Sequence, residues 1–184
     1  VTATYARVPG ESVTGGPYAI SATLSPAGVL SNYSISYNTA SFVISAKSLV
    51  IMPLAGQSKV YGDADPAFGY APVSLLGTDA LTGQLSRAAG ETVADGPYAY
   101  TLGTLTAGPN YALSLVSNPA RFTIMPKAAA VTPAAAGKVY GANEPALTGT
   151  LTGFRPAEGV TATYARVPGE SVTGGPYAIS ATLS

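Results

Sequence analysis

Residues 1–25 read VTATYARVPGESVTGGPYAISATLS, and residues 160–184 read the same without one substitution. The two copies begin 159 residues apart, which is a long period for one structural repeat. A shorter unit is visible inside that period, because the sequence Lys-Val-Tyr-Gly at residues 59–62 returns 79 residues later at 138–141. A Pro-Ala pair follows both copies. The pattern predicts a tandem repeat of 79 to 80 residues, two of which make up the longer period.

Further motifs recur in a fixed order and set the boundaries of this unit. They are Arg-x-x-Gly-Glu-x-Val at 7–13, 87–93 and 166–172, Gly-Pro-Tyr-Ala at 16–19, 96–99 and 175–178, Asn-Tyr at 32–33 and 110–111, and Phe-x-Ile at 42–44 and 122–124. Aligning them predicts three sections. Residues 1–46 are the C-terminal part of one repeat, 47–126 are a complete repeat, and 127–184 are the N-terminal part of the next. We call them the first, central and last repeats, and we expect them to be a section of a longer array.

The composition excludes several classes of function. Lys plus Arg and Asp plus Glu each count 9, and no basic run occurs, which argues against nucleic acid and anionic membranes as partners. No apolar stretch is long enough for a membrane helix, so no membrane insertion is expected. The chain has no His and no Cys, which removes imidazole bases, thiol nucleophiles, disulfides and the usual zinc ligands. We therefore expect no enzyme activity, no catalytic residue, no cofactor and no metal site.

Short apolar runs between turn residues predict strands. Tyr111, Leu113 and Leu115 alternate with small polar residues, and Phe122 and Ile124 do the same. The strands expected in the central repeat are Leu49–Ile51, Lys59–Tyr61, Leu81–Leu85, Tyr98–Leu102, Asn110–Leu115 and Arg121–Ile124. A further alternating strand is expected over residues 33–37, with Tyr33, Ile35 and Tyr37 on one face. The predicted class is all-β, with tandem small antiparallel β-sandwich or β-grasp-like domains of about 80 residues.

The junctions between repeats contain no Gly/Ser linker. Residues 122–133 run from the last expected strand of the central repeat through Pro126-Lys127 into the next repeat, and residues 42–53 make a similar step. Proline restricts φ, and short connections of this kind limit bending. We therefore expect neighbouring repeats of the same array to be partners in a semi-rigid chain.

These motifs, in this order, resemble the MBG domain of the YGX (Tyr-Gly) type, and the resemblance covers essentially the whole chain. It implies a secreted, surface-displayed tandem array of a large bacterial protein, similar to adhesins of the filamentous haemagglutinin type. The expected location is extracellular or the bacterial cell surface. One departure is the turn before the Gly-Pro-Tyr tyrosine, at 95–97 and 174–176, which is longer than the resemblance leads us to expect. The resemblance implies no particular ligand.

The recurring tyrosines have two interpretations, as a surface that stacks on sugars or as packing residues in the core and at its edge. They are Tyr61 and Tyr140, Tyr18, Tyr98 and Tyr177, and Tyr33 and Tyr111. Their regular placement on expected strands favours packing, since a buried tyrosine contributes a large apolar area and one satisfied hydroxyl.

Three groups of polar residues are further candidates. Asp63 and Asp65 could hold Ca²⁺, but the counterparts Ala142 and Glu144 keep one carboxylate only, which favours an ordinary turn. Arg87 and Glu91 flank a glycine turn, so we predict that they pair across it or are solvated. A Lys–Asn isopeptide bond, which would need residues 59, 110 and 91 to meet in the core, is the third candidate.

The expected function is that of stalk or spacer repeats in a bacterial cell-surface or secreted adhesin, projecting an adhesive region. The alternative is a repeated ligand- or glycan-binding adhesion module that acts by avidity on a host or glycan ligand of unknown identity. Binding would require an aromatic patch exposed in every repeat, whereas a spacer needs only small residues outside. The expected outward positions favour the spacer: Ser34, Ser36, Ala112, Ser114 and Thr123.

The two incomplete repeats carry a prediction of their own. Residues 1–46 contain no counterpart of the first strands of a repeat, and residues 127–184 contain none of the last strands. Unpaired sheet edges are templates for strands from another chain. We therefore expect the central repeat to be the best ordered, and the incomplete repeats to be looser or to complement one another head to tail between chains.

Overall fold

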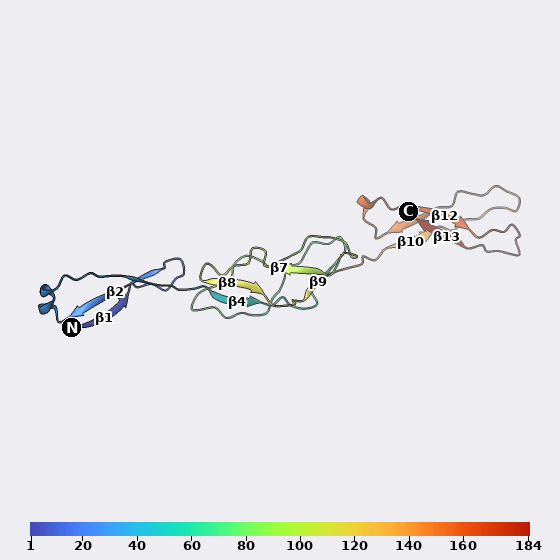
Figure 1. The fold of residues 1–184 in the computed structure, drawn as a ribbon. Coiled ribbons are helices and arrows are strands. Elements are labelled where there is room, and N and C mark those ends of the chain that lie inside the picture. The colour runs from blue at the N-terminus through green and yellow to red at the C-terminus, as the bar shows by residue number, and fades with distance from the viewer. The chain divides into compact units, whose positions relative to one another are not determined.

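The computed structural model describes all residues from Val1 to Ser184, and it confirms the predicted all-β class. Figure 1 shows the strands, with two short 3-10 turns, η1 (Ala27–Asn32) and η2 (Pro156–Glu158), as the helical elements. The strands are β1 (Thr2–Arg7), β2 (Tyr18–Ser25), β3 (Ala40–Phe42), β4 (Lys47–Ile51), β5 (Ser58–Val60), β6 (Ser86–Arg87), β7 (Tyr98–Thr101), β8 (Tyr111–Leu115), β9 (Arg121–Met125), β10 (Ala130–Pro133), β11 (Gly149–Thr152), β12 (Ala162–Arg166) and β13 (Ile179–Leu183). None of the helical turns has the length and apolar character needed to cross a membrane.

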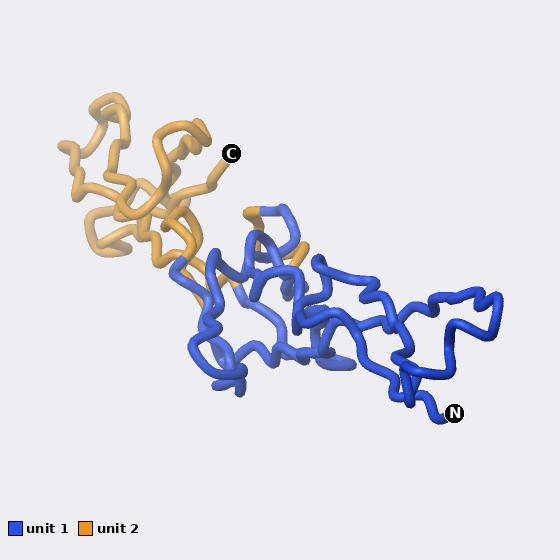
Figure 2. The backbone as a smooth tube through the Cα atoms, turned by 90° about the vertical axis from the view of Figure 1, so that its left-hand side faces the viewer, with its two compact units in different colours: residues 1–57, 66–90, 97–123 blue, residues 58–65, 91–96, 124–184 orange.

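The chain divides into two compact units, coloured separately in Figure 2. Unit 1 comprises Val1–Gln57, Pro66–Gly90 and Pro97–Thr123, and unit 2 comprises Ser58–Asp65, Glu91–Gly96 and Ile124–Ser184. Unit 1 contains the sheets β1-β2-β3 and β4-β8, and unit 2 contains β10-β11 and β12-β13. Strand β9 runs through the division and belongs to the sheet β5-β9-β7-β6. The repeat boundaries at 46/47 and 126/127 remain a prediction from the sequence.

The strand pairing follows the internal repeat. In the β1-β2 hairpin Arg7 lies opposite Ile20, and in the β12-β13 hairpin Arg166 lies opposite Ile179, at equivalent places in the two copies. These pairs are antiparallel, as are β2-β3, β6-β7, β7-β9 and β10-β11. Strands β4 and β8 instead pair in parallel, with Lys47 opposite Tyr111. The expected all-β class with antiparallel sheets holds for the pairs just named, and this parallel pair is a feature that the sequence did not indicate.

The hydrophobic core lies mainly in the central repeat. Phe122 has no exposed surface and meets the ring of Phe68 edge to face at 5.1 Å, and Phe68 meets Tyr100 in the same way at 5.4 Å. Thr123 is exposed between the buried Phe122 and Ile124, so the predicted alternation of β9 is confirmed. The buried apolar side chains are Tyr18 in the first repeat and Leu49, Ile51, Leu85, Tyr98, Tyr100, Leu105, Tyr111, Phe122 and Ile124 in the central one.

Two predicted strands are absent. Residues 81–85 contain only an isolated bridge between Thr82 and Thr106, because Gly83 has φ +77° and lies against the carbonyl of Thr104 where a strand residue would place its Cβ. Residues 33–37 also form no strand, and Tyr33 and Tyr37 are exposed. The physical reason is the missing neighbour, since the corresponding strand β8 is held beside β4 and no such strand borders residues 33–37.

Candidate functional site

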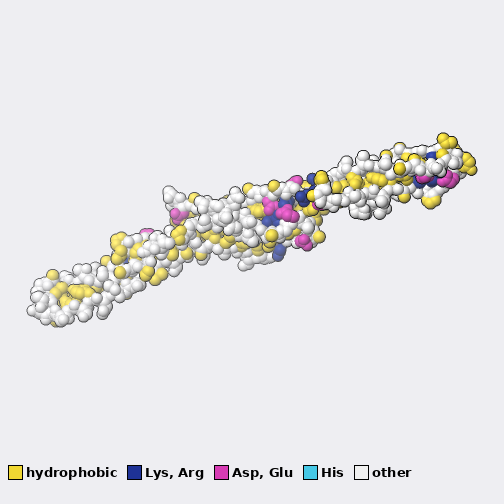
Figure 3. Space-filling model, turned by 90° about the horizontal axis from the view of Figure 1, so that it is seen from above, with side chains coloured by type: hydrophobic (Ala, Val, Ile, Leu, Met, Phe, Trp, Pro, Cys, Tyr) yellow, Lys and Arg dark blue, Asp and Glu magenta, His cyan; other side chains and the backbone are white.

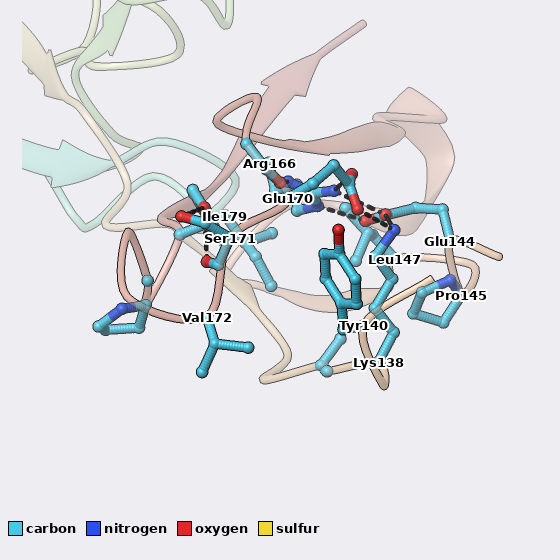
Figure 4. A pocket seen from close by; sticks show the side chains of 16 residues that line it. Lys138, Tyr140, Glu144, Pro145, Leu147, Arg166, Glu170, Ser171, Val172 and Ile179 are labelled. Carbon is cyan, nitrogen blue, oxygen red and sulfur yellow. Dashed lines mark hydrogen bonds and ion pairs between the residues drawn. The ribbon is translucent and has the colours of Figure 1, made fainter. Parts of the chain in front are cut away.

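Two cationic and two anionic side chains form a cluster in the last repeat. Lys138 Nζ lies 2.7 Å from Glu170 Oε2 and 3.4 Å from Glu144 Oε2. Arg166 donates from Nε to Glu144 at 2.6 Å and from Nη2 to Glu170 at 2.7 Å. Figure 4 shows the four side chains pointing toward one another. Each cation therefore contacts both carboxylates, and the cluster has no net charge.

The Arg-x-x-Gly-Glu motif builds one half of this cluster from local geometry. Arg166 ends β12, and its Nη1 donates to the carbonyls of Val167 at 3.0 Å and Gly169 at 2.7 Å, which fixes the turn that presents Glu170. In the first repeat Arg7 makes the same backbone contacts and also pairs with Glu11. The predicted pairing of arginine and glutamate across the turn is thus confirmed in these two copies.

The lysine half of the cluster comes from the Lys-Val-Tyr-Gly motif, which supplies Lys138 in the last repeat and Lys59 in the central repeat. In the central repeat the side chain of Lys59 is only 4% exposed, and its Nζ lies 2.7 Å from Asp65 Oδ1 and 2.5 Å from Glu91 Oε2. The two interpretations of Asp65 were a calcium ligand and, as the favoured one, part of an ordinary turn, and its ion pair with this lysine was not predicted. A signal was present, because a carboxylate stands six residues after the lysine in both copies, as Asp65 and as Glu144.

The structure brings together only part of the set suggested for an isopeptide bond. Lys59 and Glu91 are in contact, as described. Asn110 has other partners. Its side-chain Oδ1 accepts a hydrogen bond from the backbone N–H of Val13 at 2.9 Å, and its backbone carbonyl accepts one from the backbone N–H of Lys47. The lysine is held by ion pairs to two carboxylates instead.

A glycine and a tyrosine from two different motifs pack against each other in all three repeats. A Cβ at Gly90 would lie 2.3 Å from the ring of Tyr98, and Gly90 has φ +136°. The same contact joins Gly10 to Tyr18 and Gly169 to Tyr177. Only glycine combines this backbone conformation with so close an approach. The Arg-x-x-Gly-Glu and Gly-Pro-Tyr-Ala motifs are therefore two sides of one packing contact.

The tyrosines vary in exposure between copies. Tyr18, Tyr98 and Tyr111 are buried, which confirms the packing interpretation for these three. Tyr33 is 64% exposed and Tyr140 is 73% exposed, so packing is wrong for these two. Their counterparts in the central repeat, Tyr111 and Tyr61, are covered to a greater extent.

A second set of contacts in unit 2 surrounds Tyr61, at the junction of the central and last repeats. The hydroxyl of Tyr61 donates to the carboxylate of Glu158. The guanidinium carbon of Arg155 lies 5.3 Å from the centre of the tyrosine ring, a cation–π distance. A Cβ at Gly62 would lie 3.2 Å from Cδ of Arg155, so this glycine lets the arginine chain approach closely.

The ion pairs shift the pKa values of the charged cluster. A hydrogen bond from Arg166 lowers the pKa of Glu144, and hydrogen bonds from Lys138 and then Arg166 lower that of Glu170 below its ordinary 4.5. In the central repeat, burial alone would lower the pKa of Lys59, but the hydrogen bonds of this lysine to Asp65 and Glu91 outweigh burial and raise its pKa above 10.5. The cluster is thus fully ionised at neutral pH.

Acid is expected to weaken the last repeat through these two glutamates. Their folded pKa values lie below the 4.5 of an unfolded glutamate, so their contribution to stability is complete above pH 4.5 and is lost as the pH falls through the folded values. An NMR titration of the Glu144 and Glu170 carboxyl carbons should give midpoints below 4.5. The Lys138→Met variant should move the Glu170 midpoint upward, and an unchanged midpoint would contradict the assigned cause.

A groove of about 280 Å³ lies beside the cluster in the last repeat. Its lining includes Tyr177 and, labelled in Figure 4, Lys138, Tyr140, Arg166 and Ile179. In the central repeat the corresponding arginine, Arg87, lies between two aromatic rings, 4.9 Å from the centre of Tyr98 and 5.3 Å from that of Phe122. The groove therefore lies where a phenylalanine packs in the complete repeat.

Comparison with known protein families agrees with this architecture. The family model for the MBG domain (YGX type) matches residues 49–123 and 129–184. The chain belongs to the MBG domain (YGX type) family. Each matched range contains one Tyr-Gly pair, at residues 61–62 and 140–141, and one complete set of the charged residues described above. Neither the curated proteins nor the solved structures contain a match to the chain.

The two MBG matches make the chain a tandem repeat of this domain. The lysine, the following carboxylate, the arginine and the glutamate occur in both matched ranges, so both MBG copies of this chain carry the charged residues. The charged groups of the cluster neutralise one another, and their ion pairs connect two loops of the same repeat. The cluster therefore stabilises the fold of the repeat.

Proposed function

We propose that the chain is part of the stalk of a bacterial cell-surface or secreted adhesin, in which MBG repeats act as structural spacers and not as enzymes. The observation that carries the proposal is the direct connection between the central and last repeats. Strand β9 ends at Met125 and β10 begins at Ala130, so only residues 126–129 lie between them. The contacts of Tyr61 with Arg155 and Glu158 add side-chain support at this junction.

The surface composition supports the same proposal. The expected outward positions on the strands, such as Ala112, Ser114 and Thr123, are exposed small residues. On the face drawn in Figure 3 the charged side chains gather in a few places, and the rest of that face is uncharged, with both hydrophobic and other side chains. A spacer needs solubility and no specific contact along its length, and these residues suit that role.

The alternative is a repeated ligand- or glycan-binding module, which the groove lined by Tyr140 and Tyr177 favours. Avidity would require the same exposed aromatic surface in each repeat. The exposed tyrosines do not recur in this way, since Tyr33 is exposed but its counterpart Tyr111 is buried. We therefore prefer the spacer.

The proposal predicts how the size of the array grows with its length. Because residues 160–184 repeat residues 1–25, appending residues 26–184 to the chain adds one exact period. Small-angle scattering of chains with one, two and three periods should give a radius of gyration that rises in proportion to the number of periods. A freely bending chain would instead follow roughly the square root of its length.

A junction variant provides the matched control. Replacing Tyr61 by alanine in every period removes both the hydroxyl contact with Glu158 and the ring under Arg155, so the growth with length should become less steep. Thr123→Ala, at an exposed position of β9 in the complete repeat, should leave it unchanged. Square-root growth in the unaltered array would contradict the spacer role, and glycan-array binding by the repeats would then be the leading function.

A further inference from the structure

The strand that carries the arginine of the Arg-x-x-Gly-Glu motif is the outer strand of its sheet in all three repeats. Strand β1 has β2 as its single neighbour, β12 has β13, and β6 stands last in the order β5-β9-β7-β6. Strands β1 and β12 have the same sequence, and the structure shows it once with the strands that follow it, β2 and β3, and once with the strands that precede it, β10 and β11. Neither group pairs with the outer edge, so this edge is free beside either half of the repeat.

The backbone groups that β12 presents at this edge follow from its pairing with β13. Thr161 and Ser184, at the end of the hairpin, exchange two backbone hydrogen bonds. Residues of an antiparallel strand alternate between the two sides of the strand, so every second residue from Thr161 onward directs its N–H and C=O toward β13. The residues between them direct these groups outward: Ala162, Tyr164 and Arg166. No other strand pairs with β12 on that side.

The edges of β1 and β12 lack the features that usually protect a sheet edge. Such features are charged side chains, proline, bulges and very short strands. Strand β6 is protected in this way, because Gly83 has φ +77° and only two residues remain in the strand. Strand β12 has five residues and no proline, and its one charged side chain, Arg166, is neutralised by Glu144 and Glu170. The edge is therefore open to a further strand.

The outward edge of β12 is complementary to itself. When a second β12 is placed antiparallel to the first with Tyr164 opposite Tyr164, Ala162 of each strand lies opposite Arg166 of the other. In this register all the outward N–H and C=O groups find a partner, since each pair exchanges two hydrogen bonds. The arginine faces an alanine and not a second arginine, so like charges are not opposed. On the other face Thr163 lies opposite Ala165.

We propose that β1 and β12 bind the same strands of a second copy of the chain, edge to edge and antiparallel, through main-chain hydrogen bonds. The contact has twofold symmetry, so the two chains run in opposite directions along the paired strands. It joins the sheets of two repeats into one. Strand β6 takes no part, which leaves one such edge in each 159-residue period. This inference extends beyond the spacer function and does not depend on it.

The tyrosine of the strand favours a second copy over an unrelated extended peptide. Main-chain pairing gives affinity for any extended strand, and side chains give the specificity. A Cβ at Gly149 would lie 2.4 Å from the ring of Tyr164, so this ring packs against β11 and is held on one face of the sheet. A second copy places its own Tyr164 directly across the edge on the same face, and aromatic cross-strand pairs stabilise sheets.

Each chain carries two such edges, which predicts how assembly depends on concentration. Sedimentation velocity should show dimers and then larger species as the concentration rises. Ala162→Pro removes an outward N–H and leaves the hydrogen bonds with β13 in place. This variant retains the edge of β1, so it should form dimers and nothing larger.

Blocking both edges tests the proposal in full. Ala3→Pro combined with Ala162→Pro should weaken association about tenfold or more, because hydrogen bonds are lost at both ends of each contact. Ala3→Ser combined with Ala162→Ser is the matched control, since serine keeps the backbone N–H, and it should associate as the unaltered chain does. Circular dichroism of each variant reports whether the fold is retained.

Engineered cysteines test the register directly, because the chain has none of its own. One chain carries Thr163→Cys and a second, of different size through an added tag, carries Ala165→Cys. Oxidation of the mixture should join the two different chains, because directly opposed residues of neighbouring strands are close enough for a disulfide. The Thr163→Cys chain alone places its cysteines two residues out of register and should give little product.

Charged substitutions test the same contact without oxidation. Thr163 and Ala165 are exposed, as are their counterparts Thr4 and Ala6 in β1. A chain with glutamate at all four positions should remain monomeric, and so should a chain with lysine at all four, because like charges then lie opposite each other. A mixture of the two chains should associate, since opposite charges then face each other across the edge.

Three results would overturn the proposal. One is a chain that remains monomeric at millimolar concentration. Another is association that the combined Ala3→Pro and Ala162→Pro variant does not weaken, while circular dichroism shows the fold retained. The third is a disulfide that forms as readily in the Thr163→Cys chain alone as in its mixture with the Ala165→Cys chain.

Discussion

Replacing Phe122 with alanine is expected to lower the free energy of unfolding of the central repeat by about 3–5 kcal/mol. The side chain has no exposed surface, meets Phe68 edge to face at 5.1 Å and lies under the guanidinium of Arg87. Truncation leaves a cavity that these neighbours fill only in part. A domain of this size has roughly 4–12 kcal/mol of stability in total, so the loss is a large fraction of it.

Urea unfolding, monitored by amide hydrogen exchange in β7 and β9, measures the loss of unfolding free energy in the central repeat itself. Thr123→Ala is the matched control, because Thr123 is the next residue of β9 and is exposed. A change within about 0.5 kcal/mol is expected there. Equal losses for the two variants would mean that β9 contributes through its backbone pairing alone, and would contradict the core described here.

Strands with one buried face could be predicted from the sequence. The alternation at residues 111–115 and 121–124 gave both the positions of β8 and β9 and the faces of Phe122 and Ile124. The same alternation at residues 33–37 predicted a strand that is absent. Alternation shows which face a strand would bury, but a strand also needs a neighbour, and β8 has one in β4.

The failure at residues 81–85 has a local cause that the sequence contains. The counterpart of Gly83 in the last repeat is Ala162, and β12 begins at this alanine. With glycine at this place the chain takes φ +77° and the strand is reduced to β6. The strand at residues 81–85 was predicted from its apolar residues alone, although an isolated glycine in a strand pattern indicates an interruption.

The parallel pairing of β4 with β8 was beyond sequence reasoning. The paired residues, such as Lys47 and Tyr111, lie far apart in the chain, and their side-chain types are equally compatible with either direction. The charged cluster was predicted in part, since the Arg-Glu half is local and its ends are four residues apart. Lys59 and Glu91 were named together only in the isopeptide candidate, and their ion pair was not predicted because the two residues meet only through the tertiary fold.

Gly90→Ala is expected to destabilise the central repeat by about 2–6 kcal/mol. Two penalties add: a strained backbone costs roughly 1–3 kcal/mol, and an overpacked contact costs roughly 1–3 kcal/mol. The first arises because Gly90 has φ +136°, and the second because the new Cβ would lie 2.3 Å from the ring of Tyr98. The measurement is again urea unfolding with hydrogen exchange in β7.

Two further variants separate these penalties. Gly108 has φ +80° with no atom within 4 Å of a Cβ, so Gly108→Ala reports backbone strain alone and should cost less. Combining Gly90→Ala with Tyr98→Ala removes the ring, so the double variant should lose less stability than the sum of the single ones. Strict additivity would show that the ring is not the obstacle. Because Gly10 and Gly169 meet Tyr18 and Tyr177 in the same way, a positive coupling would explain why Arg-x-x-Gly-Glu and Gly-Pro-Tyr-Ala recur together in every repeat.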